Sequence, residues 1–299
     1  MKLTPHISST LQCGLIKLGI VGCGRITKRF IEEAKFVSGV IIESVYSQSN
    51  ESASVFAKEA DIPKVCHDFD QLLETPHCIY IASPHNPHAS YAKKAVASGK
   101  HVLSPNRRQR SYSILASQKG VDFLEAIKRA YMPGFQRMIV VAQNGTIGSR
   151  SVTAICTMIR PLTRRECDIS QDGGCITEHA SYPLLVIAEI FGVNEVECIT
   201  SKSIRHDTSD VDIFSRIDIH LKNPLATCAV GIGVKAEGDL VIAGTKGYIY
   251  VPAPWWLTTS FKGRFEDPVE QQKFSIPMKG DGLRYEITEF IRLINEDSR

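Results

Sequence analysis

The first half of the chain alternates short apolar runs with amphipathic segments, which is typical of parallel strands separated by helices. The apolar runs predict strands at 16–21, 40–47, 78–84, 101–104 and 121–126. The amphipathic segments predict helices at 26–37, 50–60 and 88–99. Strands joined by helices of this length require right-handed crossovers, so we expect a parallel sheet covered by helices.

From residue 195 onward, apolar and polar positions alternate with a period of two, which is typical of antiparallel strands. This alternation predicts antiparallel strands within 195–204, 211–221, 226–235 and 239–252, and Lys246-Gly247 fits a hairpin turn within the last of these segments. The final segment, 282–299, returns to helical spacing, with an apolar side made of Leu283, Ile287, Phe290, Ile291 and Ile294. We therefore expect an α/β chain of two domains, residues 1–126 and residues 127–299.

Length and composition agree with a globular protein of two domains. The chain has 299 residues, whereas single cores rarely grow past about 250 residues. Apolar residues make up 43% and charged residues 22%, and the formal net charge of +3 is too small to indicate nucleic-acid binding. Basic residues cluster at 107–110 and 164–165, which leaves local anion binding open. No apolar run reaches about 18 residues, so no membrane span is expected.

The cysteines favour a reducing compartment. Their number is nine, which is odd, and no pair has the Cys-x-x-Cys spacing of a zinc or redox site. Free buried thiols are the expected state. The N-terminal stretch carries hydroxyls, a histidine and a proline where a signal peptide needs an apolar core. We therefore expect a cytoplasmic protein without a metal site.

A glycine turn follows the first predicted strand and leads into a predicted helix. In this arrangement, backbone N–H groups at the helix N-terminus can bind a pyrophosphate. We therefore predict dinucleotide binding by Gly22, Cys23, Gly24, Arg25 and Ile26. Thr27 occupies the third small position of the motif and is bulkier than the motif prefers. A structural glycine turn in another α/β fold is the alternative.

The end of the second predicted strand bears on the choice of cofactor. A site that prefers NAD usually has Asp or Glu here, which binds the ribose 2′-hydroxyl. This chain has Ser47 and Gln48 instead, so no carboxylate repels a 2′-phosphate and no arginine attracts it. We expect either NADP or NAD to bind, with a slight preference for NADP.

Several motifs resemble the Gfo/Idh/MocA oxidoreductases. They are "GIVGCGRI", "IYIASPHNPHASYAKKAVASGKHVL" and "FLEAIKRAYMPGFQRM". Two others, "DGGCITEHASYPLLVIAEIFG" and "GTKGYIYVPAPWW", resemble the dihydrodiol dehydrogenase branch of that family. The resemblance implies an N-terminal Rossmann domain and a C-terminal α+β domain whose mostly antiparallel open sheet commonly forms a homodimer. It also implies hydride transfer between a nicotinamide and a hydroxyl-bearing carbon of a small sugar, polyol or diol.

The catalytic motif of that family is missing. Family members follow the "HVL" strand with Glu-Lys-Pro, whose lysine assists proton transfer, but here Ser104 and Pro105 follow Leu103. The next residues include Arg107, Arg108 and Arg110. Arginine remains protonated in proteins, so it is a poor base, and a solvated loop is the alternative interpretation. Lys128, at the end of the next strand, is the nearest substitute, although it is equally consistent with an ordinary exposed lysine.

Two further groups of residues are candidates on the strength of the resemblance. Ser83, Pro84, His85 and His88 lie in a strand-to-helix loop where the family contacts its cofactor, although a purely structural role for His88 is equally consistent. Glu178 and Tyr182 are four residues apart, so they share one helix face. The family has Asp and His or Tyr at these positions, which implies a catalytic pair; a capping carboxylate and an interfacial tyrosine are the alternative.

Two functions follow from the sequence. The first is an NAD(P)-dependent oxidoreductase in which Lys128, Tyr182 and Glu178 replace the missing lysine. The second is a catalytically impaired homologue that keeps dinucleotide binding as a binding or regulatory module.

Overall fold

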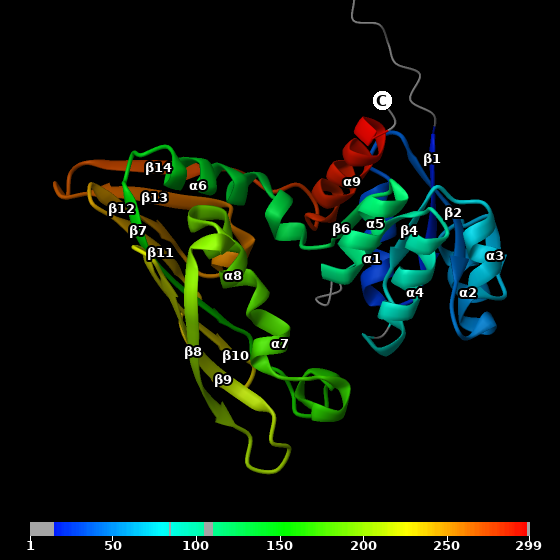
Figure 1. The fold of residues 1–299 in the computed structure, drawn as a ribbon, viewed down its shortest axis with the longest axis horizontal. Helices are drawn as coiled ribbons and strands as arrows, with labels where there is room; N and C mark the ends of the chain where they lie inside the picture. The colour runs from blue at the N-terminus through cyan, green and yellow to red at the C-terminus, as the bar shows by residue number, and fades with distance from the viewer. Residues whose placement is uncertain (1–14, 84, 105–109, 298–299) are drawn as a thin grey trace, which may run out of the picture. The chain divides into compact units, whose positions relative to one another are not determined.

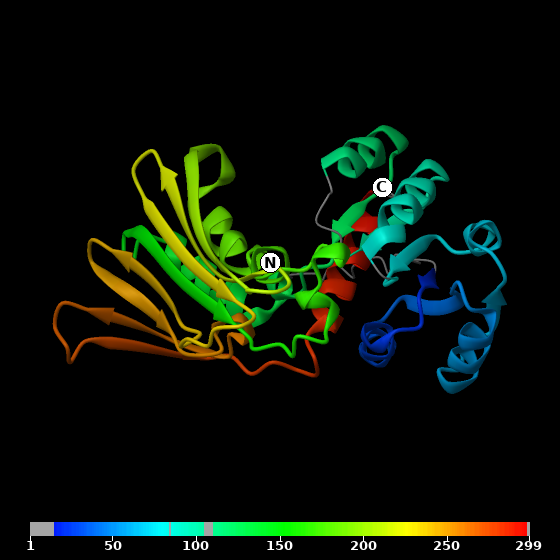
Figure 2. The ribbon, with the colours of Figure 1, turned by 90° about the horizontal axis from the view of Figure 1, so that it is seen from below.

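The computed structural model of the chain describes residues 15–83, 85–104 and 110–297. It divides into two compact units, drawn in Figures 1 and 2. The first runs up to Ile127 and takes up the chain again from Leu283; the second is Lys128–Gly282. The segment from Leu283 was expected in the second domain, but it packs in the first because its apolar face completes that unit's core.

The first unit contains a six-stranded parallel sheet in the order β3-β2-β1-β4-β5-β6. Its strands are β1 Ile16–Val21, β2 Val40–Tyr46, β3 Lys64–Cys66, β4 Cys78–Ile81, β5 His101–Ser104 and β6 Phe123–Glu125. The order reverses direction between β1 and β4. In parallel sheets of this kind, ligands bind at the carboxyl ends of the strands beside that reversal.

Helices cover both faces of this sheet. They are α1 Arg25–Ala34, α2 Asn50–Glu59, α3 Phe69–Glu74, α4 His85–Ala97, α5 Arg110–Lys119 and α9 Leu283–Asp297. Successive residues of β4 point to opposite faces, so Tyr80 joins one apolar cluster while Ile79 and Ile81 join another. The two clusters form one core on each side of the sheet.

Helix α9 packs against α1 in the first of these cores (Figure 1). The five apolar residues expected on one side of the helix are all at most 6% exposed. The Arg284 guanidinium donates two hydrogen bonds to the Glu33 carboxylate, at 2.9 Å from Nε and 2.8 Å from Nη2. The same guanidinium lies 4.2 Å from the centre of the Phe36 ring. The helix is therefore held by apolar packing and by a bidentate ion pair.

The second unit contains an eight-stranded sheet in the order β14-β13-β12-β11-β7-β10-β9-β8. Neighbouring strands are antiparallel except β7 and β10, which run parallel. The strands are β7 Ser149–Thr157, β8 Val196–Arg205, β9 Asp212–Leu221, β10 Leu225–Gly231, β11 Leu240–Gly244, β12 Gly247–Val251, β13 Ser260–Phe265 and β14 Gln271–Ser275.

The helices of this unit are α6 Pro133–Gln143, α7 Cys175–His179 and α8 Ser181–Phe191. Helix α8 contacts β7, and α7 contacts β9 and β10. On β7, Val152 and Ala154 are fully buried whereas Thr153 is exposed, so one face is covered and the other is open. This confirms the expected fold class: a Rossmann domain with a parallel sheet and an α+β domain with a mostly antiparallel open sheet. In the described part of the chain, no helix has the length and apolar character needed to cross a bilayer.

Candidate functional site

The glycine turn after β1 lies against the loop after β4, at the reversal of the strand order. Gly22 has φ +99°, a conformation that side chains other than glycine rarely adopt. A Cβ on Gly22 would stand 2.8 Å from the Ala82 carbonyl oxygen, which is too close for any real contact. Glycine at this position therefore permits both the turn and the close approach of the two loops.

Gly24 leaves the start of α1 open. It is the N-cap residue, with extended backbone angles, and it provides no side-chain acceptor to the first helical N–H groups. A Cβ built on Gly24 meets nothing within 4 Å, and Arg25 and Ile26 are exposed. Uncapped N–H groups at a helix N-terminus attract anions. The residues present therefore fit the pyrophosphate of a dinucleotide.

Thr27 fits the motif in spite of its size. Its side chain is fully buried, and its Oγ1 donates a hydrogen bond of 3.0 Å to the Gly22 carbonyl. The hydroxyl therefore closes the turn from inside, and its extra volume relative to glycine or alanine is accommodated with its polar atom satisfied.

The candidate cofactor residues Cys23 and Ser47 are brought together. Burial raises the pKa of the Cys23 thiol, and a hydrogen bond with the Ser47 side chain opposes that increase. Gln48, the next residue, is exposed. Ser49 is used locally, since its Oγ accepts from the Ser52 N–H and caps α2. The turn after β1 and the end of β2 thus lie side by side at the carboxyl edge of the parallel sheet.

His88 has partners within the first unit. Its ring is 4% exposed, Nε2 pairs with the Ser83 carbonyl, and Nδ1 lies 3.5 Å from the Ser104 hydroxyl at the end of β5. Pro84 lies outside the described residues, as does the side chain of His85. The part of the chain that the structure describes has no group of three His, Cys, Asp or Glu residues placed to bind a metal.

Lys128 begins a short 3-10 helix in the second unit and forms an ion pair there. Its Nζ donates to the Asp281 carbonyl at 2.7 Å and to Asp281 Oδ1 at 3.0 Å. The lysine side chain is 19% exposed. Both contacts come from one residue, so the head group is positioned by Asp281.

Tyr182, near the start of α8, is contacted by two side chains. The Arg129 guanidinium lies 3.4 Å from the centre of the Tyr182 ring, a cation–π contact. Arg129 Nε also donates to the Trp256 carbonyl at 2.7 Å. Burial lowers the pKa of Arg129, and interactions with Tyr182 and Cys156 oppose that change. The His179 ring meets Tyr182 edge-on, with 6.1 Å between ring centres.

Glu178 and Tyr182 lie on two consecutive helices, not on the single helix that the sequence pattern suggested. Helix α7 ends at His179 and α8 begins at Ser181. The reason is Pro183, which has no N–H to donate to the His179 carbonyl. Glu178 is 13% exposed, and its Oε1 lies 3.4 Å from Arg165 Nη1.

The start of α7 is fixed by Asp212 from β9. Asp212 Oδ2 accepts from the Ile176 N–H at 2.8 Å and from the Cys175 thiol at 3.0 Å. Gly174 precedes the helix with φ +133°, and a Cβ there would stand 2.1 Å from Asp212 Oδ1. This contact sets the position of the helix that carries Glu178.

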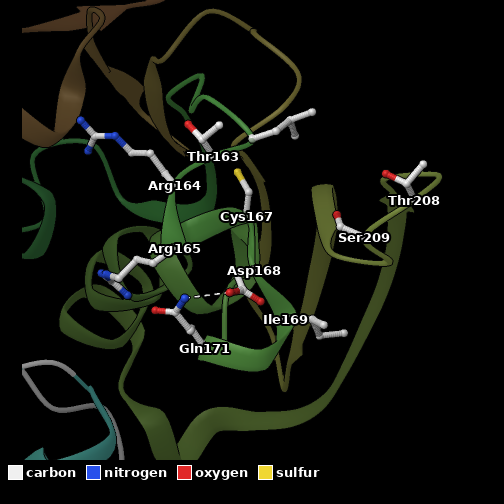
Figure 3. Close-up of a pocket in the computed structure, with 10 residues that line it drawn as sticks. Thr163, Arg164, Arg165, Cys167, Asp168, Ile169, Gln171, Thr208 and Ser209 are labelled. Carbon is white, nitrogen blue, oxygen red and sulfur yellow. Dashed lines mark hydrogen bonds between the residues drawn. The ribbon is translucent and has the colours of Figure 1, made fainter.

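A cavity of about 480 Å³ lies in the second unit (Figure 3). Its walls are the loop Leu162–Gln171 and the tip of the β8–β9 hairpin at Thr208 and Ser209. Asp168 organises the loop by accepting from the Ser170 N–H at 2.9 Å and from Gln171 Nε2 at 2.7 Å. Hydrogen bonds from the Ser170 side chain, the Gln171 side chain and the Ser170 backbone, in that order, lower the pKa of Asp168.

Sequence reasoning did not identify the contacts of Arg129, His179 and Trp256 around Tyr182. Arg129 and His179 are adjacent in sequence to candidates that were chosen, whereas Trp256 reaches the cluster through its backbone carbonyl. Only the presence of two consecutive aromatic residues, Trp255 and Trp256, marked the segment as unusual. Trp255 proves to be a packing residue, since it is 1% exposed and its Nε1 donates to the Ile155 carbonyl at 2.8 Å.

Comparison with known proteins connects the fold to a group of enzymes. Residues 16–104 match the family model described as "Oxidoreductase family, NAD-binding Rossmann fold" (GFO_IDH_MocA). Trans-1,2-dihydrobenzene-1,2-diol dehydrogenase of Bos taurus is 26% identical over 288 residues, which cover 91% of this chain and 86% of that protein.

Two further proteins are similar to this chain. The scyllo-inositol 2-dehydrogenase (NADP(+)) IolU of Bacillus subtilis is 30% identical over 132 residues, 42% of this chain and 40% of that protein. A crystal structure of a 3-ketoreductase from Actinomadura kijaniata has a TM-score of 0.79 at 18% identity and covers 95% of this chain and 90% of that one. This structural likeness supports the fold.

Proposed function

We propose that this chain, which is similar to the Gfo/Idh/MocA oxidoreductases and to trans-1,2-dihydrobenzene-1,2-diol dehydrogenase, transfers hydride between NAD(P) and a hydroxyl-bearing carbon. The substrate is a small sugar, polyol or diol. The observation that carries the proposal is the glycine turn at the reversal of the parallel sheet, where α1 begins without a side-chain cap.

The cofactor would be held by the first unit. Gly22, Gly24 and the first turn of α1 suit the pyrophosphate, and Ser47 and Gln48 border the ribose position. The missing carboxylate at the end of β2 supports NADP over NAD, and IolU, whose name specifies NADP(+), is similar over 42% of the chain. When bound, a nicotinamide supplies the hydride chemistry.

Within the second unit, we propose that the Tyr182 hydroxyl transfers the proton to or from the substrate oxygen. The contacts with Arg129 and His179 fix the ring of Tyr182, so the hydroxyl has one preferred direction. Glu178 orients the substrate from the preceding helix, and Lys128 is the second proton carrier. A positioned acid or base of this kind typically contributes about 10²–10⁴-fold to a rate.

A catalytically impaired homologue is the second candidate, and one observation favours it. Lys128, the substitute for the missing lysine, already donates to two oxygens of Asp281. A head group held in this way must leave Asp281 before it can reach a substrate oxygen. In that case the protein keeps dinucleotide binding as a binding or regulatory module.

The deciding experiment is a fluorescence titration with NADPH and NADH, followed by a panel of diols, polyols and sugars monitored at the nicotinamide absorbance. The oxidoreductase proposal predicts binding and turnover, with NADPH bound more tightly than NADH. Binding without turnover on every substrate supports the impaired homologue. Failure to bind either nucleotide contradicts both proposals.

We further propose that two copies pair through the open face of the second sheet. Tyr248, Tyr250 and Val241 lie half-buried on that face, with Tyr250 directly opposite Val241 across β11 and β12. Light scattering should give a dimer for the wild type and a monomer for Tyr250→Glu. A wild-type protein that is monomeric at high concentration would contradict this.

A cytoplasmic location is also proposed. It is supported by the eight described cysteines, all of which are free thiols. Fractionation of expressing cells should recover the protein with cytoplasmic markers, and recovery with secreted or membrane fractions would refute the assignment.

A further inference from the structure

Three cationic side chains of the second unit gather at the carboxyl end of β7. Arg160 follows β7 and Lys235 follows β10, and these two strands run parallel, so both residues lie at the same edge of the sheet. The Arg160 N–H donates to the Ile232 carbonyl at 2.8 Å, and Lys235 Nζ donates to the Thr157 carbonyl at 3.2 Å. Arg129 reaches the same edge from the short helix before α6.

Cys156 is the shared neighbour of the three cations. Its side chain is fully buried in β7, and burial raises the pKa of the thiol to about 12. The positive charges of Arg129, Lys235 and Arg160 all oppose this increase. The contacts also bring the three cations together, because Arg129 Nε donates to the Trp256 carbonyl and the Trp256 ring lies against Gly238, three residues after Lys235.

No carboxylate in the described part of the chain pairs with any of the three. Arg129 contacts a backbone carbonyl and the Tyr182 ring, and Lys235 contacts a backbone carbonyl. Arg160 Nη2 lies 3.7 Å from the Met158 sulfur, and its buried Nε has no hydrogen-bond partner.

Two acids that act on the same region as Arg160 are engaged with other arginines. The charges of Glu166 and Glu178 raise the pKa of the Cys167 thiol, and the charge of Arg160 lowers it. Glu166 lies 3.8 Å from Arg164, and Glu178 lies 3.4 Å from Arg165. Neither acid forms an ion pair with Arg129, Arg160 or Lys235 in the described part of the chain.

We propose that Arg129, Arg160 and Lys235 bind an oxyanion of the substrate, so that the substrate is a sugar acid or a sugar phosphate. A planar guanidinium with free N–H groups matches the geometry of a carboxylate or a phosphate. Arg129 is one of these three residues, and its guanidinium also lies against the Tyr182 ring. An anion bound by the cluster would therefore lie next to the proposed proton carrier. The inference rests on the proposed function, because it names the substrate class of the same site.

The test compares D-glucose, D-glucuronate and D-glucose 6-phosphate by titration calorimetry on the full-length protein. The three share a pyranose ring, and they differ in bearing no anion, a carboxylate or a phosphate. We expect at least one anionic sugar to bind about tenfold or more tightly than glucose, as charge-assisted hydrogen bonds imply. Both tryptophans of the chain lie at 255–256, and Trp256 accepts from Arg129, so tryptophan fluorescence should report the same binding.

The variants Arg160→Gln and Lys235→Gln should each reduce the affinity for the anionic sugar by about tenfold and leave glucose unaffected. Lys262→Gln is the matched control, because Lys262 is an exposed lysine on β13, two strands away from β11. Thermal unfolding without ligand checks that the variants fold. Because each substitution removes a positive charge from the cluster, the midpoint of thermal unfolding should be unchanged or raised. A lowered midpoint together with unchanged affinity for the anion would overturn the proposal.

The outcomes separate this inference from the proposed function. An anionic sugar that binds through Arg160, while no substrate of the panel is oxidised, supports the anion site and contradicts the oxidoreductase. If glucose is turned over and binds as tightly as both anionic sugars, the oxidoreductase is supported and the anion site is overturned. Absence of binding by either anionic sugar also overturns it.

Discussion

Tyr182 shows how much a single side chain depends on its neighbours. A solvent-exposed tyrosine would sample several rotamers, whereas here a guanidinium covers one face of the ring and a histidine meets it edge-on. The contacts come from Arg129 and His179, which belong to different helices. The hydroxyl is therefore oriented by tertiary packing, and this orientation is what a proton carrier needs.

Tyr182→Phe should retain the fold and lose turnover. The ring and its contacts remain, so circular dichroism and the thermal midpoint should be unchanged, while kcat/KM falls by about a hundredfold or more because the hydroxyl is gone. Tyr285→Phe, a tyrosine of α9 in the first unit, is the control and should keep its activity. Undiminished turnover in Tyr182→Phe would remove the hydroxyl from the mechanism.

Lys128 is tested by a pair of variants. If the lysine moves a proton, Lys128→Ala should lower kcat by about a hundredfold, and Asp281→Asn should also lower kcat because it removes the carboxylate that positions Nζ. If the lysine only anchors the chain, Lys128→Ala should lower the thermal midpoint and leave kcat per folded molecule unchanged. The second result would favour Tyr182 as the only proton carrier.

At the scale of elements, many segments with a clear period were predicted, whereas β3, α3, α5, α6 and β7 were not. The strand expected at 16–21 matches β1, because a buried parallel strand has an unbroken apolar run. Strand β3 and helix α3 have three and six residues, too few to show a period. The break between α7 and α8 was missed because Pro183 was treated as part of a helical pattern.

The same limit applies to the candidate site. The glycine turn could be predicted because its spacing is local, whereas the stacking of Arg129 on Tyr182 joins residues far apart in sequence. The apolar side of α9 was predicted correctly, but amphipathic spacing does not specify which core a helix covers. Partners distant in sequence therefore came from the structure alone.

Phe290→Ala should destabilise the first unit. Phe290 is 1% exposed in the core shared by α1 and α9, so truncation leaves a cavity and should lower the free energy of unfolding by about 3–5 kcal/mol. Thr288→Ala alters an exposed position of the same helix and should change it far less. Urea denaturation measures both, and an equal effect of the two substitutions would show that α9 is not part of this core.

For the whole molecule, the two units have separate cores, and their stabilities can be measured by different signals. Both tryptophans lie in the second unit, while the proposed cofactor residues lie in the first. NADPH at about 100 times its Kd should stabilise the first unit by about 2.7 kcal/mol. Hydrogen exchange should therefore slow in β1 and β2, whereas tryptophan-monitored unfolding should shift little. A shift confined to the tryptophans would place the nucleotide in the second unit.

The discontinuous first unit has a consequence for synthesis on the ribosome. Its parallel sheet is translated early, but the helix that covers α1 is encoded about 155 residues after that sheet ends, beyond the whole of Lys128–Gly282. Until α9 emerges, Phe30, Ile31 and their neighbours lack their final cover. The nascent sheet therefore presents apolar surface for most of translation, and a chaperone that shields such surface would act on this half of the protein first.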